Sequence, residues 1–126
     1  MTRILVIEDD APLRDWLKQV LNHRGYDVQL SVDGIEGLSR LADASYDVLL
    51  LDLIMPRMSG FEVMTALEEK GIRIPTVITS GIVIPGVHDY LKTHPQVRLL
   101  SKPYSEEQLR EVIEALAEAS RRKKDP

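Results

Sequence analysis

The chain has no cysteine among its 126 residues. Disulfide bonds, thiolate metal sites and cysteine nucleophiles are therefore excluded. No apolar stretch approaches the roughly 20 residues that a membrane span needs, and acidic residues follow Arg3 so soon that we expect no signal peptide. The sequence also lacks a Walker loop and a glycine-rich dinucleotide fingerprint, so nothing indicates nucleotide binding. These absences favour a cytoplasmic protein that does not associate with a membrane.

The charge is distributed unevenly along the chain. Four basic residues and one acidic residue give segment 121–126 a net charge of +3. Because the net charge of the whole chain is −4, residues 1–120 carry −7. An acidic body argues against direct nucleic-acid binding. A run of like charges is usually a solvated chain end. We therefore expect one domain over residues 1–120, followed by a basic tail or linker stub over 121–126.

Four short apolar runs rich in Val, Ile and Leu predict strands of a parallel sheet that is buried on both faces. They cover residues 4–7, 48–51, 76–79 and 99–101. A weaker alternation over 26–32 predicts one more strand. Apolar residues at helical spacing, with capping residues at their ends, predict helices over 11–24, 34–42 and 61–70 and from the Ser105–Gln108 capping box onward. This alternation predicts an α/β fold with right-handed crossovers and helices on both faces of the sheet.

The weakest part of the predicted fold is segment 82–97. The dipeptides Pro85-Gly86 and His94-Pro95 interrupt it and leave only about Val87 to Thr93 for a helix. We therefore expect a fourth helix that is short or irregular and loosely held.

A few single residues carry separate expectations. Asp10 is placed to cap the first helix, and Trp16 is expected to pack or half-pack on it. His23, His88 and His94 lie far apart in the sequence, and we expect all three to be surface residues that form no metal site.

Polar residues follow four of the predicted strands. Glu8 and Asp9 follow the run 4–7, Asp52 follows the run 48–51, and Ser80 and Lys102 follow the last two runs. In open α/β sheets, ligands bind outside the carboxyl ends of the strands. If the strands are parallel, these side chains meet at one edge, where they could hold one divalent cation and one phosphoryl group.

The residue types suit phosphoryl chemistry. Glu8, Asp9 and Asp52 could give Mg²⁺ the oxygen ligands it prefers, and carboxylates that close together repel one another unless a cation neutralises them. Asp52 stands alone at a strand end, and a carboxylate can act as a nucleophile that forms an aspartyl-phosphate. Ser80 could hydrogen-bond one phosphoryl oxygen while Lys102 neutralises another.

Several stretches of the chain together resemble the receiver domain of two-component response regulators over residues 2 to about 120. The most specific is Asp52-Leu53-Ile54-Met55-Pro56-Arg57-Met58-Ser59-Gly60, and the others are residues 4–10, 79–81 and 102–103. The resemblance implies a flavodoxin-like sheet of five parallel strands in the order 2-1-3-4-5.

The resemblance also implies a metal site and a phosphoacceptor. Asp52 matches the phosphorylated aspartate of the family. Glu8 and Asp9 match its acidic pair, with Asp9 the direct Mg²⁺ ligand and Glu8 acting through water. The backbone carbonyl of Ile54 matches the third protein ligand of the metal.

Around the phosphoryl group, Ser80 matches the switch residue of the family and Lys102 the phosphate-binding lysine. Gly81 matches the small residue beside the phosphoryl group. The Lys102-Pro103 peptide bond resembles one that is cis in this family.

The implied function is phosphoryl transfer in two-component signalling. The donor would be a sensor histidine kinase or a histidine phosphotransfer protein, and the acceptor Asp52, with Mg²⁺ as cofactor. The phosphorylated domain would then switch a surface that binds a downstream protein. It would not be an enzyme in the usual sense, because it would catalyse only its own phosphotransfer and slow self-dephosphorylation.

Two alternatives stay open. The first is a receiver-like interaction module that is not phosphorylated, although a damaged acid pocket would be expected there and every pocket position is filled. The second is a small phosphatase or phosphotransferase with an Asp nucleophile. Such enzymes use another Asp two residues after the nucleophile, where this chain has Ile54.

The sequence departs from the family pattern at three positions. Receivers often carry Tyr or Phe three residues before the lysine, where this chain has Leu99. We therefore expect phosphorylation to change how well ordered segment 82–97 is. Ile54 and Ile82, two residues after Asp52 and Ser80, occupy positions that line the route of the hydrolytic water in this family. Their apolar side chains predict slow self-dephosphorylation.

Overall fold

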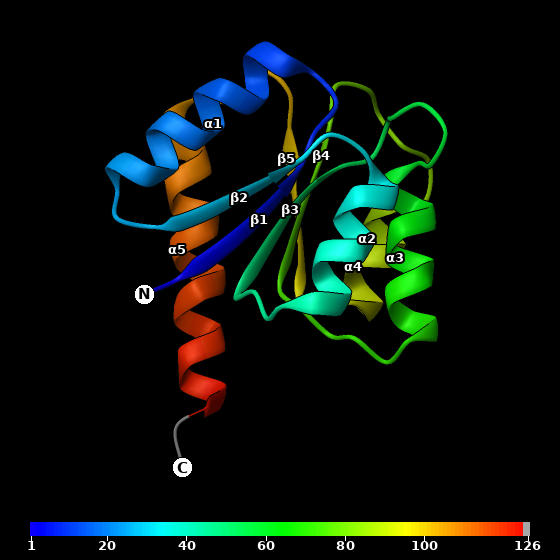
Figure 1. Ribbon diagram of the computed structural model, residues 1–126. Helices are drawn as coiled ribbons and strands as arrows, with labels where there is room; N and C mark the ends of the chain where they lie inside the picture. Colours follow the sequence, from blue (N-terminus) through cyan, green and yellow to red (C-terminus); the bar gives the residue numbers. More distant parts are fainter. Residues whose placement is uncertain (125–126) are drawn as a thin grey trace.

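A computed structural model of the chain describes residues 1–124, with side chains up to Ser120. Strands and helices alternate in the order β1 (Arg3–Ile7), α1 (Ala11–His23), β2 (Asp27–Ser31), α2 (Gly34–Asp43), β3 (Val48–Asp52), α3 (Gly60–Glu69), β4 (Thr76–Ser80), α4 (Val87–Thr93), β5 (Val97–Ser101) and α5 (Glu106–Lys124). The sheet forms the middle layer. Helices α1 and α5 lie on one face, and α2, α3 and α4 lie on the other (Figure 1).

The sheet has five parallel strands in the order β2-β1-β3-β4-β5. Both the predicted α/β fold and the predicted strand order are therefore confirmed. In this register Ile7 pairs with Leu51, and Asp52 pairs with Thr79. The residues that follow β1, β3 and β4 consequently lie side by side at one edge of the sheet.

The central strands are buried on both faces because successive side chains point to opposite sides. On β1, Ile4 and Val6 pack into the cluster under α1 and α5. Leu5 and Ile7 pack into the cluster under α2, α3 and α4. All four are fully buried, so this strand is held rigidly from both sides.

The edge strand β5 is longer than predicted. It begins at Val97 and not at residue 99, because Val97 is 2% exposed and pairs with Thr76. The Thr76 N–H also donates to the Gln96 carbonyl at 3.0 Å. The alternation is hidden in the sequence because Arg98 interrupts it; its side chain is exposed, as is common on edge strands. Helix α4, in contrast, has the short range that was predicted.

One helix start and one helix cap differ from expectation. Helix α3 begins at Gly60, one residue early, because Ser59 and Glu62 form a capping box. Asp10 does occupy the N-cap position of α1, but its side chain makes no capping hydrogen bond. Pro12, at the second helical position, has no N–H for it to accept from, and the Asp10 N–H itself donates to Glu8.

Trp16 is half-buried on α1, as expected, with its ring centroid 6.2 Å from that of Tyr104. His94 lies at the surface but is half-buried, with a side chain that is 24% exposed and contacts Glu68 and Tyr90.

Helix α5 begins with the predicted capping box, in which the Gln108 N–H donates to Ser105 Oγ and the Ser105 N–H to Gln108 Oε1. Its backbone continues to Lys124, and residues 125–126 lie outside the described residues. The domain boundary at residue 120 stays a prediction. None of the described helices is long and apolar enough to cross a membrane.

Candidate functional site

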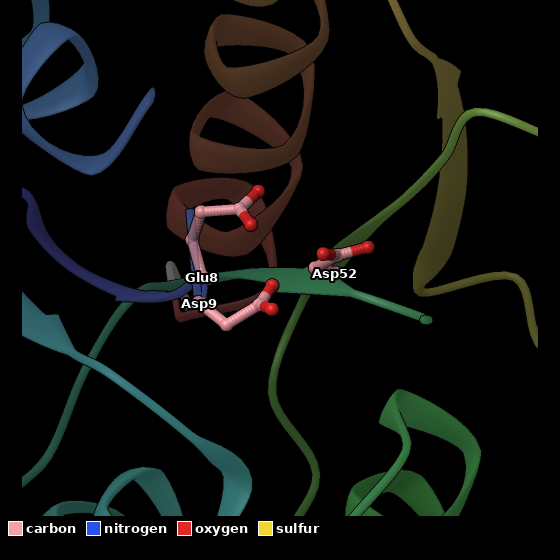
Figure 2. A group of neighbouring side chains, drawn as sticks. All are labelled: Glu8, Asp9 and Asp52. Atoms are coloured by element: carbon pink, nitrogen blue, oxygen red, sulfur yellow. The ribbon is translucent and has the colours of Figure 1, made fainter. Parts of the chain in front are cut away.

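Three carboxylates meet at the carboxyl ends of β1 and β3. Glu8 and Asp9 come directly after β1, and Asp52 is the last residue of β3. One ligand oxygen from each lies within 4.8 Å of the others, and Figure 2 shows the three side chains directed toward a shared space. Glu8 is 2% exposed and Asp52 is 5% exposed, whereas Asp9 is exposed. The cluster therefore combines two buried acids with one exposed acid.

Lys102 neutralises part of this negative charge. Its Nζ lies 2.9 Å from Glu8 Oε1 and 3.3 Å from Asp52 Oδ2. Burial lowers the pKa of Lys102, but the hydrogen bond to Glu8 and the charges of Glu8 and Asp52 outweigh it and raise that pKa. The backbone holds the lysine in place, because its N–H donates to the Ser80 carbonyl at 2.8 Å.

Glu8 is harder to ionise than an ordinary glutamate. Burial, with a smaller contribution from the charge of Asp52, raises the pKa of Glu8 to about 7. The hydrogen bonds from Lys102 and from the Asp10 N–H act in the opposite direction. A divalent cation in the shared space would stabilise the ionised form of this carboxyl.

Asp52 is positioned by the loop that follows it. Its Oδ1 accepts a hydrogen bond from the Ile54 N–H at 3.2 Å. Gly60, the first residue of α3, packs so closely that a Cβ there would lie 2.5 Å from the Asp52 carbonyl oxygen and 2.7 Å from the Leu53 Cα. Glycine is therefore required at the end of the motif by close backbone packing.

Ser80 lies beside this pocket with its hydroxyl directed at its own loop. Ser80 Oγ donates to the Ile82 carbonyl at 2.9 Å and accepts from the Ile82 N–H at 3.1 Å. Gly81 lies next to Lys102, and a Cβ on it would be 3.9 Å from the Lys102 Cβ, an ordinary contact. The peptide bond between Lys102 and Pro103 is cis, as the family resemblance implied.

Apolar side chains lie exposed on the loops around the pocket. Ile54 is 52% exposed, Ile82 63% and Val83 91%. We call these three residues the apolar rim. They follow β3 and β4, the strands that carry Asp52 and Ser80. The rim therefore lies on the loops beside the acids.

The sequence analysis missed two charged residues that hold the site loops. Arg14 Nη1 donates to the Glu8 carbonyl at 2.9 Å and to the Asp9 carbonyl at 3.1 Å. Arg57, whose φ is 68°, pairs with Asp33 at 3.0 Å and links the loop after β3 to the start of α2. Arg14 was detectable as a cation in the helix turn that follows the acid pair. Nothing in the sequence signals the contact of Arg57.

A cavity of about 550 Å³ opens between α1 and the segment after β5. Its lining joins apolar and aromatic side chains to the Lys102 side of the acid pocket: Asp10, Leu13, Trp16, Gly81, Lys102, Pro103 and Tyr104. Burial, together with the charges of Glu8 and Asp52, raises the pKa of Tyr104. The phenol therefore remains neutral beside the acids.

The acid cluster could bind a metal ion. All its donors are carboxylate oxygens, which suit a hard divalent cation. The raised pKa of Glu8 gives a second reason, because a cation would offset the burial and the charge of Asp52 that disfavour the ionised carboxylate. Glu8, Asp9, Asp52 and Lys102 are brought together as predicted, and Ser80 lies at the next strand end. The metal-binding role of the Ile54 carbonyl stays a prediction.

A family model for the response regulator receiver domain matches residues 4–114, and the chain belongs to this family. It is therefore a receiver domain of the kind used in two-component signalling and not a classical enzyme.

Similar proteins agree with this assignment. The response regulator MprA of Mycobacterium avium is 39% identical over 79 residues, which cover 63% of this chain and 35% of MprA. The alignment thus spans about a third of that relative. The receiver domain of the Francisella response regulator 1452 superposes with a TM-score of 0.86 at 26% identity, covering 95% of this chain and 99% of that one. The chemotaxis protein CheY4 of Vibrio cholerae superposes with a TM-score of 0.83 at 26% identity, covering 92% and 98%.

Proposed function

We propose that the chain accepts a phosphoryl group from a phosphohistidine donor onto Asp52 in a Mg²⁺-dependent reaction. The observation that carries the proposal is the position of Lys102, whose ammonium group lies between Glu8 and Asp52 at 2.9 and 3.3 Å. A buried nucleophilic carboxylate, a cation beside it and two further acids for a metal make up what phosphoryl transfer needs.

The transfer forms one bond and breaks another. A carboxylate oxygen of Asp52 attacks the phosphorus atom, and the P–N bond to the donor imidazole breaks. The leaving nitrogen keeps the electron pair and is then protonated. Asp9 and Asp52, the Ile54 carbonyl and, through water, Glu8 would hold Mg²⁺, which when bound neutralises charge on the phosphoryl oxygens.

Lys102 and Ser80 act after the attack. Lys102 exchanges its contact with Asp52 for one with a phosphoryl oxygen, which keeps a cation next to the new negative charge. Ser80 rotates to donate to another oxygen and must release both of its hydrogen bonds with Ile82. The loop after β4 is thereby uncoupled from the strand, which supports the expected change of order in segment 82–97.

The partners follow from this chemistry. The donor is a sensor histidine kinase or a histidine phosphotransfer protein in the cytoplasm, and the apolar rim offers it a contact surface beside Asp52. The phosphorylated domain acts on a downstream protein, with no direct nucleic-acid contact of its own. The same rim hinders the hydrolytic water, so the phosphoryl group is retained for long.

The test is the intact mass of the protein after incubation with a small phosphodonor and Mg²⁺, next to an Asp52→Asn control. We expect the wild type to gain one phosphoryl group only when Mg²⁺ is present, and the variant to gain none. No gain by a folded protein that binds Mg²⁺ would favour the unphosphorylated interaction module. Continuous turnover of small phosphate esters would instead favour the phosphatase.

A further inference from the structure

The two ends of helix α4 are held very differently. The helix has seven residues, the fewest among the described helices. It starts after Gly86, which adopts φ 80° and gives no side-chain cap. The Val87 N–H reaches only the Ile84 carbonyl, at 3.2 Å, in the loop that also carries the exposed Ile82. This start is fixed mainly by the burial of Val87 and by the packing of Ile84 against the core.

The other end is fixed by His94. Its imidazole stacks on the Tyr90 ring, with 3.8 Å between the centroids and 13° between the planes. The Nδ1 atom lies 2.8 Å from the Tyr90 carbonyl oxygen, and Nε2 lies 3.1 Å from Glu68 Oε1 on α3. A single ring thus contacts α4 through its face and one nitrogen and α3 through the other nitrogen.

The contacts of His94 stabilise the carboxyl-terminal ends of both α4 and α3. Carbonyl groups in the last turn of a helix lack backbone partners within the helix, and the Tyr90 carbonyl, which accepts from the Thr93 hydroxyl at 3.0 Å, is one of these. Glu68 lies in the last turn of α3, where no basic residue offsets the negative end of the helix dipole. One neutral tautomer of the ring satisfies both nitrogens, because Nε2–H donates to Glu68 while Nδ1 accepts from the same Thr93 hydroxyl, 2.9 Å away, in a bond shared with the Tyr90 carbonyl.

We infer that His94 is a positioning residue that latches the carboxyl-terminal end of α4 to α3, so that α4 moves as a flap about this end. The free end is the one that follows the Ser80–Ile82 contacts. The flap rests on the proposed function, because phosphorylation of Asp52 is the event that releases Ser80 from Ile82. The latch itself exists without phosphorylation and can be tested alone.

The latch is tested by amide hydrogen exchange, measured by NMR, in the resting protein. We expect His94→Ala to speed exchange of the amides from Tyr90 to Thr93 about tenfold and Glu68→Gln to speed it about threefold, the size of effect that one or two net hydrogen bonds give. The double variant should exchange no faster than His94→Ala, because both changes break one contact. His88→Ala, at an exposed position of the same helix, should leave these exchange rates unchanged.

Unaltered exchange in His94→Ala and Glu68→Gln would overturn the latch. Should His94→Ala fail to fold, Glu68→Gln decides alone, since Glu68 lies on the surface.

The flap is tested by adding beryllofluoride and Mg²⁺ as a phosphoryl mimic. In the wild type we expect faster exchange over residues 82–87 that fades toward Thr93, and in His94→Ala a change that extends to Thr93. A uniform change of amide exchange along α4 in the wild type would overturn the flap. Unchanged exchange in segment 82–97 while beryllofluoride occupies Asp52 would also overturn it. If Asp52 takes up neither mimic nor phosphoryl group, the proposed function fails with the flap, while the resting measurement still decides the latch.

Discussion

The acid pocket and the segment from Ile82 to Thr93, which starts beside it after β4, are built in opposite ways. In the pocket, Lys102 contacts two buried acids, and Gly60 packs against the backbone of Asp52. The segment carries Val83 with 91% of its surface exposed and starts its helix at an uncapped glycine. Chemistry needs groups held in place before the reaction, whereas a response to that chemistry needs an element of low local stability. The difference therefore separates the site that reacts from the part that responds.

The largest effect is expected from a substitution that disturbs the rigid acid pocket. We expect Gly60→Ala to lower the free energy of unfolding by about 2 kcal/mol, because the new Cβ collides with backbone atoms that cannot rotate away. The same shift displaces Asp52, so phosphorylation should also fail. Denaturant unfolding and intact mass measure the two effects.

The matched control is Gly81→Ala, because a Cβ at this position makes an ordinary contact at 3.9 Å. Its unfolding midpoint should stay close to that of the wild type. Equal losses in the two variants would mean that the fit at Gly60 has no special role in holding the pocket.

A second prediction concerns the ionisation of Glu8 in the acid pocket. The pKa of Glu8 is about 4.5 in the unfolded chain and is raised to about 7 in the folded protein, mainly by burial. Between these values the native state binds the additional proton, so the stability of the metal-free protein should fall as the pH rises from 4.5 to 7. Glu8→Gln removes this dependence and should weaken Mg²⁺ binding about tenfold. Thermal unfolding in a chelator and Mg²⁺ titration of the Trp16 fluorescence are the measurements.

Asp15→Asn is the control for the second prediction, since Asp15 is an exposed acid on α1. It should leave both the slope of stability against pH and the Mg²⁺ affinity as they are. A wild type whose stability rises steadily from pH 4.5 to 7 would contradict the assignment of the buried charge to Glu8.

A third prediction concerns the apolar rim, where the rigid part meets solvent. Ile54→Asn replaces an exposed branched side chain with one that can hold water next to Asp52. We expect the phosphoryl group to be lost about fivefold faster, a change of about 1 kcal/mol in the barrier. The decay of the phosphorylated mass measures it, and Ile35→Asn, an exposed isoleucine on α2, is the control. Unchanged decay in Ile54→Asn would remove the rim from the hydrolysis step.

The parts of the molecule that follow from local patterns were predictable. Buried strands are visible in the sequence as apolar runs. Polar residues at the ends of parallel strands lie at the same edge of the sheet. The sequence therefore placed Glu8, Asp9, Asp52 and Lys102 together. The short α4 was predictable because proline and glycine limit a helix from both sides.

What depends on a single contact across the fold was not predictable. The strand at Val97 was missed because Arg98 breaks its alternation, and pairing with Thr76 overrides the local pattern. The ring of His94 has a role only because Glu68 of α3 lies opposite. The hydroxyl of Ser80 has several possible acceptors in the sequence, and only the folded loop selects Ile82.

The smallest expected effect comes from Ser80→Ala, which tests the joint between the two regions. The change removes the hydroxyl that binds both the N–H and the carbonyl of Ile82. Because an exposed loop regains part of this bonding from water, we expect exchange of the Ile82 amide to rise only about threefold in the resting protein. The response of segment 82–97 to beryllofluoride should shrink at the same time, since the loop is already released. Ser101→Ala, at the exposed position that pairs with Ser80 on β5, should alter neither. A full response in Ser80→Ala would mean that the pocket reaches α4 by another route, and the separation of a reacting part from a responding part would then need a different joint.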